Sequence, residues 1–226
     1  MQKIGLFLLL LIATLGLNAQ VRPTVAVLGD SYSTFEGFIP KGHPEWYRTN
    51  VNKAATDVDK VEQTWWWQVV KNGGYKLGVN DSYSGSTVCF TGYDDADFSD
   101  RSFVTRATNL GTPDIILVCG GTNDSWCGAK VGEYKYEGWK RADMYYFRPA
   151  LAKLYTVLRE HYPNVEIYFI LNDCLRDDIN ESVDVISKHY GVPVIKLSGI
   201  DKQNGHPNVK GMKTFADQVL SALKKK

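Results

Sequence analysis

The sequence lacks an excess of charge of either sign. Its 226 residues include 26 Lys and Arg against 25 Asp and Glu, which leaves a formal net charge of +1. Nucleic acids and anionic membranes attract clusters of basic residues, so the composition gives no reason to expect either as a partner. With 44% hydrophobic and 23% charged residues, the chain also lacks the bias typical of disordered, collagen-like or coiled-coil proteins. We therefore expect a folded globular protein.

Metal-binding patterns are absent as well. No set of Cys and His residues has the spacing of a zinc site, so we predict no metal. Four cysteines allow three complete pairings, and the sequence does not choose among them; they are Cys89, Cys119, Cys127 and Cys174. Cys119 ends an apolar run and is expected to be a buried free thiol, whereas a bridge between Cys89 and Cys127 remains an alternative.

No apolar run is long enough to span a membrane. The longest extends from Ile4 to Leu17, short of the roughly 20 residues that a spanning helix needs. A basic start precedes it and the small residue Ala19 follows it, which is the layout of a secretory signal peptide. We expect cleavage after Ala19, with residues 1–19 removed and residues 20–226 exported to the periplasm or the medium without a stable membrane anchor.

Residues 20–226 contain no internal repeat or low-complexity linker, which indicates a single domain. Short β-rich runs alternate with longer helical patterns, an order typical of a mostly parallel sheet covered by helices. The predicted strands are 24–28, 75–79, 114–119, 166–171 and 192–197, and the predicted helices are 61–71, 143–161, 179–190 and 209–223. This pattern predicts an α/β fold with five strands.

Two long connections interrupt the alternation. Residues 32–60 are rich in aromatic, Gly and Pro residues, and residues 90–110 are polar. Loops of this length inside a compact domain are usually functional or mobile. The second connection contains an acidic cluster whose spacing matches no known calcium loop, so we expect a solvated surface; its members are Asp94, Asp95, Asp97 and Asp100.

Candidate chemical groups follow the predicted strands. Ser31 comes directly after the first strand, and ligands of open parallel sheets bind at the carboxyl ends of strands. Gly-Asp-Ser is also common turn chemistry, but Asn123 follows the third strand and can donate from its amide to a developing oxyanion. The N–H of Gly85 offers a further donor. His206, between Gly and Pro before the last helix, could act as general base for Ser31.

These blocks, in this order, resemble the SGNH (GDSL-type) hydrolase family. They are Gly29-Asp30-Ser31, Gly85, Gly120-Gly121-Thr122-Asn123-Asp124 and His206-Pro207, and the resemblance extends from Val25 to Val219. It implies a flavodoxin-like three-layer α/β/α sandwich and ester hydrolysis without a cofactor. It also implies that Ser31 is the nucleophile and His206 the base. The implied oxyanion hole consists of the Ser31 N–H, the Gly85 N–H and the Asn123 side chain.

Two positions depart from the family pattern. Tyr32 stands where the family commonly has Leu, and Gln203 stands where it usually has Asp, three residues before the His. The nearest upstream acid is Asp201. Either Asp201 reaches the imidazole, or Ser31 and His206 act as a dyad whose ring is oriented by Gln203 or by a backbone carbonyl. Activity could survive either arrangement, because an orienting group mainly fixes the tautomer and stabilises the imidazolium.

Aromatic residues suggest the substrate. Three consecutive tryptophans on one helix cannot all face the core, and other rings lie near predicted loops; the set is Trp46, Tyr47, Trp65, Trp66, Trp67, Trp126 and Trp139. Exposed rings suit sugars, so we expect a largely uncharged carbohydrate ester such as an acetylated polysaccharide, although aromatic side chains also fill cores. The alternatives are a lipase, lysophospholipase or thioesterase, a non-catalytic glycan-binding domain, and a flavodoxin-like phosphate or flavin binder; acyl transfer in place of hydrolysis is also open.

Overall fold

A five-stranded parallel sheet forms the centre of the molecule. The computed structural model describes residues 22–224, so the expected signal peptide, residues 1–19, lies outside the described residues. The strands are β1 (Thr24–Gly29), β2 (Lys76–Ser82), β3 (Ile115–Gly120), β4 (Glu166–Leu171) and β5 (Val194–Lys196), in the spatial order β2-β1-β3-β4-β5. All neighbouring pairs run parallel. The predicted number and order of strands along the chain are confirmed.

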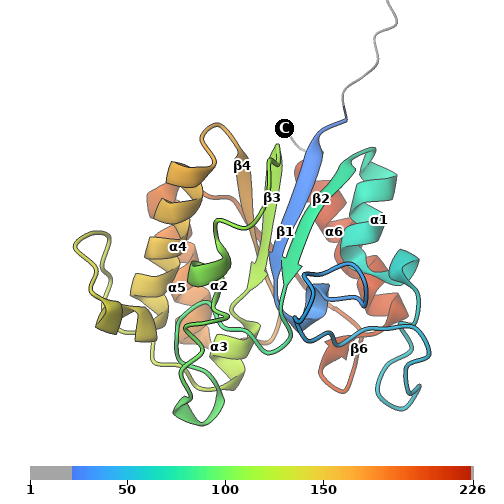
Figure 1. The fold of residues 1–226 in the computed structure, drawn as a ribbon, viewed down its shortest axis with the longest axis horizontal. Helices are drawn as coiled ribbons and strands as arrows, with labels where there is room; N and C mark the ends of the chain where they lie inside the picture. The colour runs from blue at the N-terminus through green and yellow to red at the C-terminus, as the bar shows by residue number, and fades with distance from the viewer. Residues whose placement is uncertain (1–21, 225–226) are drawn as a thin grey trace, which may run out of the picture.

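Helices cover both faces of this sheet (Figure 1). On one face lie α1 (Trp65–Gly73) and α6 (Val209–Leu223), and on the other α2 (Phe103–Arg106), α4 (Phe147–His161) and α5 (Asp177–Tyr190). The short α3 (Thr122–Trp126) follows β3. The arrangement is the expected three-layer α/β/α sandwich. No helix within residues 22–224 is long and apolar enough to cross a membrane.

The sequence prediction differs from the structure mainly at helix starts. The helix expected over 61–71 is divided at Thr64 into a 3₁₀ turn (Val61–Gln63) and α1. The helix expected from residue 143 begins at Phe147, after a 3₁₀ turn (Arg141–Tyr145). Short helical turns have the same apolar spacing as the helix that follows, so hydrophobic periodicity alone does not separate them.

The core consists of two apolar layers, one on each face of the sheet. Successive side chains of a strand point to opposite faces, so Leu28 of β1 packs with the layer under α4 and α5, while Val27 packs with the layer under α1 and α6. In the second layer the rings of Trp65 and Phe215 stack with centroids 4.5 Å apart. β1, β3 and β4 are buried on both faces, which explains why their sequences are nearly continuous apolar runs.

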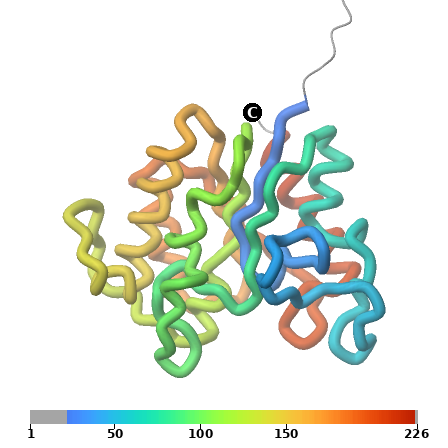
Figure 2. Tube along the Cα trace, viewed as in Figure 1, coloured from blue at the N-terminus to red at the C-terminus, as the bar shows by residue number. Residues whose placement is uncertain are grey.

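The long connections gather at one end of the molecule. Parallel strands all end at the same edge of the sheet, so the segments that follow β1 and β2 lie together there (Figure 2). A small antiparallel hairpin of β6 (Lys202–Gln203) and β7 (His206–Pro207) lies at the same end and leads into α6. The fold therefore collects the segments that follow β1, β2 and β3, together with this hairpin, at the carboxyl edge of the sheet.

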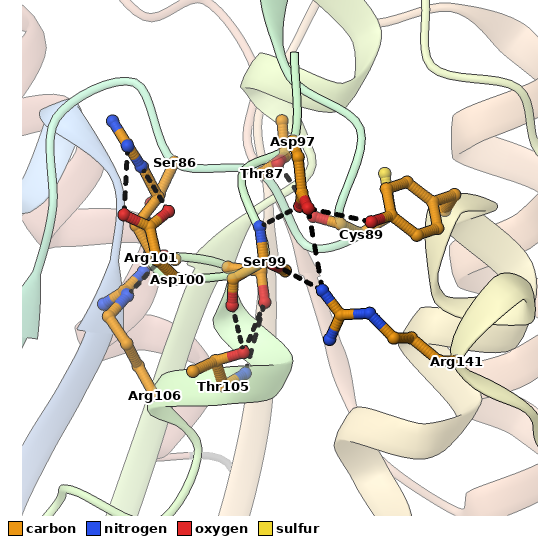
Figure 3. A network of polar contacts seen from close by, with 12 residues as sticks. Ser86, Thr87, Cys89, Asp97, Ser99, Asp100, Arg101, Thr105, Arg106 and Arg141 are labelled. Carbon is orange, nitrogen blue, oxygen red and sulfur yellow. Dashed lines mark hydrogen bonds and ion pairs between the residues drawn. The ribbon is translucent and has the colours of Figure 1, made fainter. Parts of the chain in front are cut away.

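Polar contacts order the second long connection. The carboxylate of Asp97 accepts hydrogen bonds from the Ser99 N–H at 2.8 Å and the Tyr145 hydroxyl at 2.9 Å. Arg141 lies 3.6 Å from Asp97 and donates to the Ser99 hydroxyl at 3.0 Å (Figure 3). Within residues 22–224, no cluster of His, Cys, Asp or Glu is arranged to hold a metal ion. The acidic residue Asp97 thus serves to fasten the loop to the segment before α4.

All four cysteines are free thiols. Cys119 is buried in β3, as expected. The alternative of a bridge between Cys89 and Cys127 is wrong for this structure, in which both Sγ atoms contact the carbonyl oxygen of Thr91, at 3.6 Å and 3.9 Å. The connection around the site is therefore held by hydrogen bonds and packing instead of a disulfide.

We expect Phe215→Ala to lower the free energy of unfolding by about 3–5 kcal/mol, because it removes a fully buried ring and leaves a cavity beside Trp65. Urea denaturation followed by circular dichroism measures this change. The matched control on the same helix is Lys213→Ala, whose side chain is 69% exposed and whose loss should change stability by no more than about 0.5 kcal/mol. A loss below about 1 kcal/mol for Phe215→Ala would contradict the packing described.

Candidate active site

Ser31 lies in a tight turn directly after β1. The turn is a 3₁₀ helix (Ser31–Ser33), and the carboxylate of Asp30 caps it by accepting the Tyr32 N–H at 3.0 Å. Gly29 lets the turn pack closely, since a Cβ there would lie 2.5 Å from the Ser82 hydroxyl oxygen. The strand end and the cap therefore fix the position of the Ser31 hydroxyl at the edge of the sheet.

His206 reaches Ser31 from the far end of the sequence. The ring nitrogen Nε2 lies 2.9 Å from the Ser31 Oγ, although the two residues are 175 positions apart. Both residues are nearly buried, with 3% of Ser31 and 7% of His206 exposed. The structure thus brings together the nucleophile and base that the sequence predicts.

The other ring nitrogen of His206 faces a backbone group. Nδ1 lies 3.1 Å from the carbonyl oxygen of Asn204. Asp201 instead pairs with Lys210 at 3.1 Å, and the Gln203 amide donates to the carbonyl of Lys53 at 2.8 Å. The alternative in which Asp201 completes a triad is therefore corrected. In this structure a peptide carbonyl faces Nδ1 of His206, and neither Asp201 nor Gln203 does.

Side chains from the first long connection hold the hairpin that carries His206. The Tyr32 hydroxyl donates to the carbonyl of Gly205 at 2.5 Å, and the Tyr47 hydroxyl donates to the carbonyl of Pro207 at 2.9 Å. The Asn172 amide in turn donates to the Tyr32 hydroxyl at 3.2 Å. A Leu at position 32 could neither donate to Gly205 nor accept from Asn172, so the departure at Tyr32 has a structural role that sequence reasoning missed.

Asn123 presents its side-chain amide from the start of α3. Its Nδ2 donates to the carbonyl of Ser86 at 2.9 Å, and its Oδ1 accepts from the Tyr93 hydroxyl at 2.7 Å. These two bonds set the plane of the amide. A primary amide has two N–H groups, and this arrangement uses one of them on Ser86. The second N–H is the group that can stabilise an oxyanion.

The loop after β2 brings Gly85 to the same edge. The Tyr83 N–H donates to the carbonyl of Gly29 at 3.1 Å, so this loop starts beside the strand end that precedes Ser31. Gly85 has a φ of +82°, a conformation that favours glycine. Tyr93, which orients Asn123, was missed by sequence reasoning because a single Tyr in a polar loop carries no signal of its partner.

Burial governs the protonation of His206. Removal from water lowers the pKa of its imidazole from 6.5 to about 4, the hydrogen bond to the Asn204 carbonyl opposes this effect, and the positive charge of Lys202 adds to it. Lys202 itself pairs with Asp173. The imidazole is therefore neutral at neutral pH, which is the form that a general base needs.

Several buried ionisable groups lie close to the ends of β1 and β3. Burial raises the pKa of Asp30 to about 7 and that of Asp124 to about 6. Arg106 pairs with Asp81 at 3.2 Å and also donates to the carbonyl of Gly29 at 3.1 Å. The guanidinium thus ties β1 and β2 together where they end. Breaking a buried pair of this kind typically costs about 3–5 kcal/mol.

Aromatic rings surround His206. Trp46 stacks on the imidazole with centroids 3.7 Å apart and planes 9° apart, and Trp126 lies at 5.8 Å with planes 75° apart. Trp126 is 44% exposed and Tyr93 37%. The expectation of a wider exposed aromatic surface is only partly met, because Trp65, Trp66 and Tyr47 are core residues and Trp67 and Trp139 are half-buried.

Comparison with known proteins identifies relatives of this chain. A family model for GDSL-like lipases and acylhydrolases matches residues 23–223. A solved structure described as a GDSL-like lipase from Bacteroides ovatus is 49% identical, with a TM-score of 0.90, and the match covers 92% of this chain and 100% of that one. A second, from Bacteroides uniformis, is 51% identical with a TM-score of 0.89 and covers 92% and 98%.

More distant structures share the fold. A family two carbohydrate esterase from Clostridium thermocellum, solved in complex with cellohexaose, is 13% identical with a TM-score of 0.61, and the match covers 90% of this chain and 64% of that one. No curated protein matches the sequence.

We expect the imidazole of His206 to titrate with a pKa of about 4, well below the ordinary 6.5, because burial disfavours the charged form. Nitrogen-15 NMR of the histidine rings across a pH series measures this value, with the urea-unfolded chain as control. Because the unfolded chain binds this proton more readily, His206 lowers stability as the pH falls from about 6.5 to about 4. A pKa at or above 6.5 in the folded protein would refute the argument from burial.

Proposed function

Since the chain belongs to the GDSL-like lipase/acylhydrolase family, the SGNH hydrolases, and is an ester-hydrolysing enzyme, we propose that Ser31 and His206 hydrolyse carboxylic esters as a catalytic dyad. The observation that carries this proposal is the 2.9 Å contact between the Ser31 Oγ and the His206 Nε2. A serine hydroxyl is a weak nucleophile until a neighbouring base takes its proton. His206 is neutral, and its Nε2 lies within hydrogen-bond reach of that proton.

The reaction then proceeds by acyl transfer through the enzyme. His206 takes the proton of Ser31 while the Oγ attacks the ester carbonyl, and the carbonyl oxygen gains the negative charge. The tetrahedral intermediate collapses when the C–O bond to the alcohol breaks and His206 returns the proton to that alcohol. Water, deprotonated by His206, then attacks the acyl-enzyme and releases the carboxylic acid and the free Ser31.

The oxyanion is stabilised by donors from three loops. In this proposal they are the N–H of Ser31, the N–H of Gly85 and the free N–H of the Asn123 amide. Asn123 is held by Tyr93 and Ser86 before any substrate binds, so little reorganisation is needed as charge develops. Preorganised donors in a partly buried site are typically the largest electrostatic contribution to acyl transfer.

For the substrate we favour O-acyl groups, acetyl above all, on carbohydrate. Trp126 is exposed and lies beside the His206 ring, and the exposed Tyr93 contacts Asn123. Aromatic planes of this kind pack against the apolar faces of sugar rings. The likeness to carbohydrate esterases is distant and indicates only the fold. We also propose that the domain acts after export, in the periplasm or the medium, because residues 1–19 have the layout of a signal peptide.

Ser31→Ala should abolish hydrolysis of p-nitrophenyl acetate and leave the urea unfolding transition in place, because the serine side chain contacts only His206 through its hydroxyl. Asn123→Ala should lower kcat about 10²- to 10³-fold, the typical effect of losing one oxyanion donor. Both are measured by absorbance of released p-nitrophenol. Full activity in Ser31→Ala would overturn the nucleophile assignment, and an unchanged kcat in Asn123→Ala would remove that residue from the oxyanion hole.

Trp126→Ala should weaken the use of acetylated sugars more than that of p-nitrophenyl acetate. The exposed part of the indole is available to a bound sugar, whereas its contact with His206 affects both substrates alike. We expect kcat/KM for acetylated xylose or cellobiose to fall about 5- to 30-fold, in line with the loss of one stacking contact of about 1–2 kcal/mol. A coupled acetate assay measures both substrates. Equal losses on both substrates, or a wild-type preference for long-chain acyl esters of glycerol, would contradict the carbohydrate proposal.

A further inference from the structure

The dyad lacks a carboxylate partner, although its chemistry creates a positive charge. Each proton transfer from Ser31 or water converts His206 into an imidazolium. The carbonyl of Asn204 accepts the Nδ1 hydrogen, but a carbonyl has no net charge, and Lys202 disfavours the cation. Some other group must compensate for a buried cation in this position.

Trp46 covers one face of the imidazole. The ring centroids are 3.7 Å apart and the planes are 9° apart, which is a closely parallel stack. The indole N–H is buried and has no hydrogen-bond partner within the described residues, so packing alone and not a hydrogen bond of the ring explains its position. A buried N–H without a partner is unfavourable, so this indole N–H lowers the stability of the folded protein.

Hydrogen bonds of Trp46 and its neighbour Tyr47 connect this segment to the turn that carries Ser31 and to the hairpin that carries His206. The Trp46 N–H donates to the Thr34 hydroxyl at 2.8 Å, and that hydroxyl donates to the carbonyl of Ser31 at 3.0 Å. The adjacent Tyr47 donates to the carbonyl of Pro207 at 2.9 Å. These bonds fix the position of the indole relative to the turn that carries Ser31 and to the hairpin that carries His206.

We propose that Trp46 takes the place of the missing carboxylate: its indole face orients the His206 ring and stabilises the imidazolium that forms during proton transfer. Trp46 is then a positioning residue for the dyad, and the inference rests on the proposed roles of Ser31 and His206. The face of an indole carries a negative quadrupole, and it attracts a cation more strongly when water is excluded. The low exposure of His206 supplies that exclusion.

Other groups near His206 do not supply this stabilisation. On its own hairpin, Lys202 is a cation that is paired with Asp173. In the turn and the first connection, burial raises the pKa of the Tyr32 and Tyr47 hydroxyls, so both stay neutral.

The acidic groups on the packed elements are engaged elsewhere or disfavoured as anions by burial. Asp57 accepts the Val209 N–H at 2.8 Å, and Asp201 pairs with Lys210. Asp30 accepts the Tyr32 N–H through Oδ1, its Oδ2 has no hydrogen-bond partner within the described residues, and burial raises the pKa of this carboxyl to about 7. Trp126, from α3, contacts the imidazole at an inclination of 75° and does not stack on it. Trp46 is therefore the group whose electron-rich face lies parallel to the imidazole.

The test lowers the electron density of the Trp46 indole and leaves the shape of the ring nearly unchanged. Site-specific incorporation of mono-, di-, tri- and tetrafluorinated tryptophan at position 46 withdraws electron density from the ring step by step. We expect kcat for p-nitrophenyl acetate to fall progressively, by about 5- to 30-fold over the series, with KM unchanged, since this range corresponds to a cation–π contribution of about 1–2 kcal/mol. The pKa of His206 from the pH profile of kcat/KM should fall in step.

The matched control is the same series at Trp139. That indole is half-buried and donates to the Lys135 carbonyl at 3.0 Å, outside the site, so kcat and the pKa of His206 should be unchanged. A flat response at position 46 in both readouts would show that Trp46 only fills space and would overturn the proposal. It would leave the proposed function intact, because that function is tested by Ser31→Ala.

Discussion

The contact between Ser31 and His206 depends on a hairpin that has almost no structure of its own. The strands β6 and β7 contain two residues each, too few to be stable alone. Their position comes from outside: the Tyr32 and Tyr47 hydroxyls bind the carbonyls of Gly205 and Pro207. Side-chain amides of the hairpin in turn bind carbonyls of the first long connection, Gln203 to Lys53 and Asn204 to Ala54 and Ala55. The His206 ring is therefore positioned by the loop that follows Ser31.

Much of this architecture could be predicted from the sequence, because it depends on residue type. Buried parallel strands read as apolar runs, and Ser31, Asn123 and His206 follow or precede predicted elements at the sheet edge. Parallel strands force those ends together, so order along the chain was enough to predict proximity. The same logic did not decide between Asp201 and a backbone carbonyl as the group that faces His206, because charge and position near the His say nothing about the direction in which the loop turns. In the structure Asp201 pairs with Lys210.

The remaining contacts of the site are made by groups whose partners cannot be inferred from residue type. The Asn204 carbonyl that faces His206 belongs to the backbone, which every residue has. Tyr93 and Trp46 lie in long connections whose path is set by many polar contacts, so their contacts with Asn123 and His206 follow only from the folded loops. Tyr32 did carry a signal, as a polar substitute in an apolar position, but its partner Gly205 could not be inferred.

The peptide carbonyl of Asn204 that faces His206 limits which amino-acid substitutions the hairpin tolerates. Asn204 and Gly205 have φ angles of +50° and +77°, so the carbonyl points at the imidazole only while two consecutive residues keep a left-handed backbone. No side-chain replacement can delete the carbonyl itself, whereas a β-branched residue at either position would turn it away. The direction of the carbonyl that faces His206 thus depends on the backbone conformation of these two residues, while the side-chain bonds of the hairpin set where it lies.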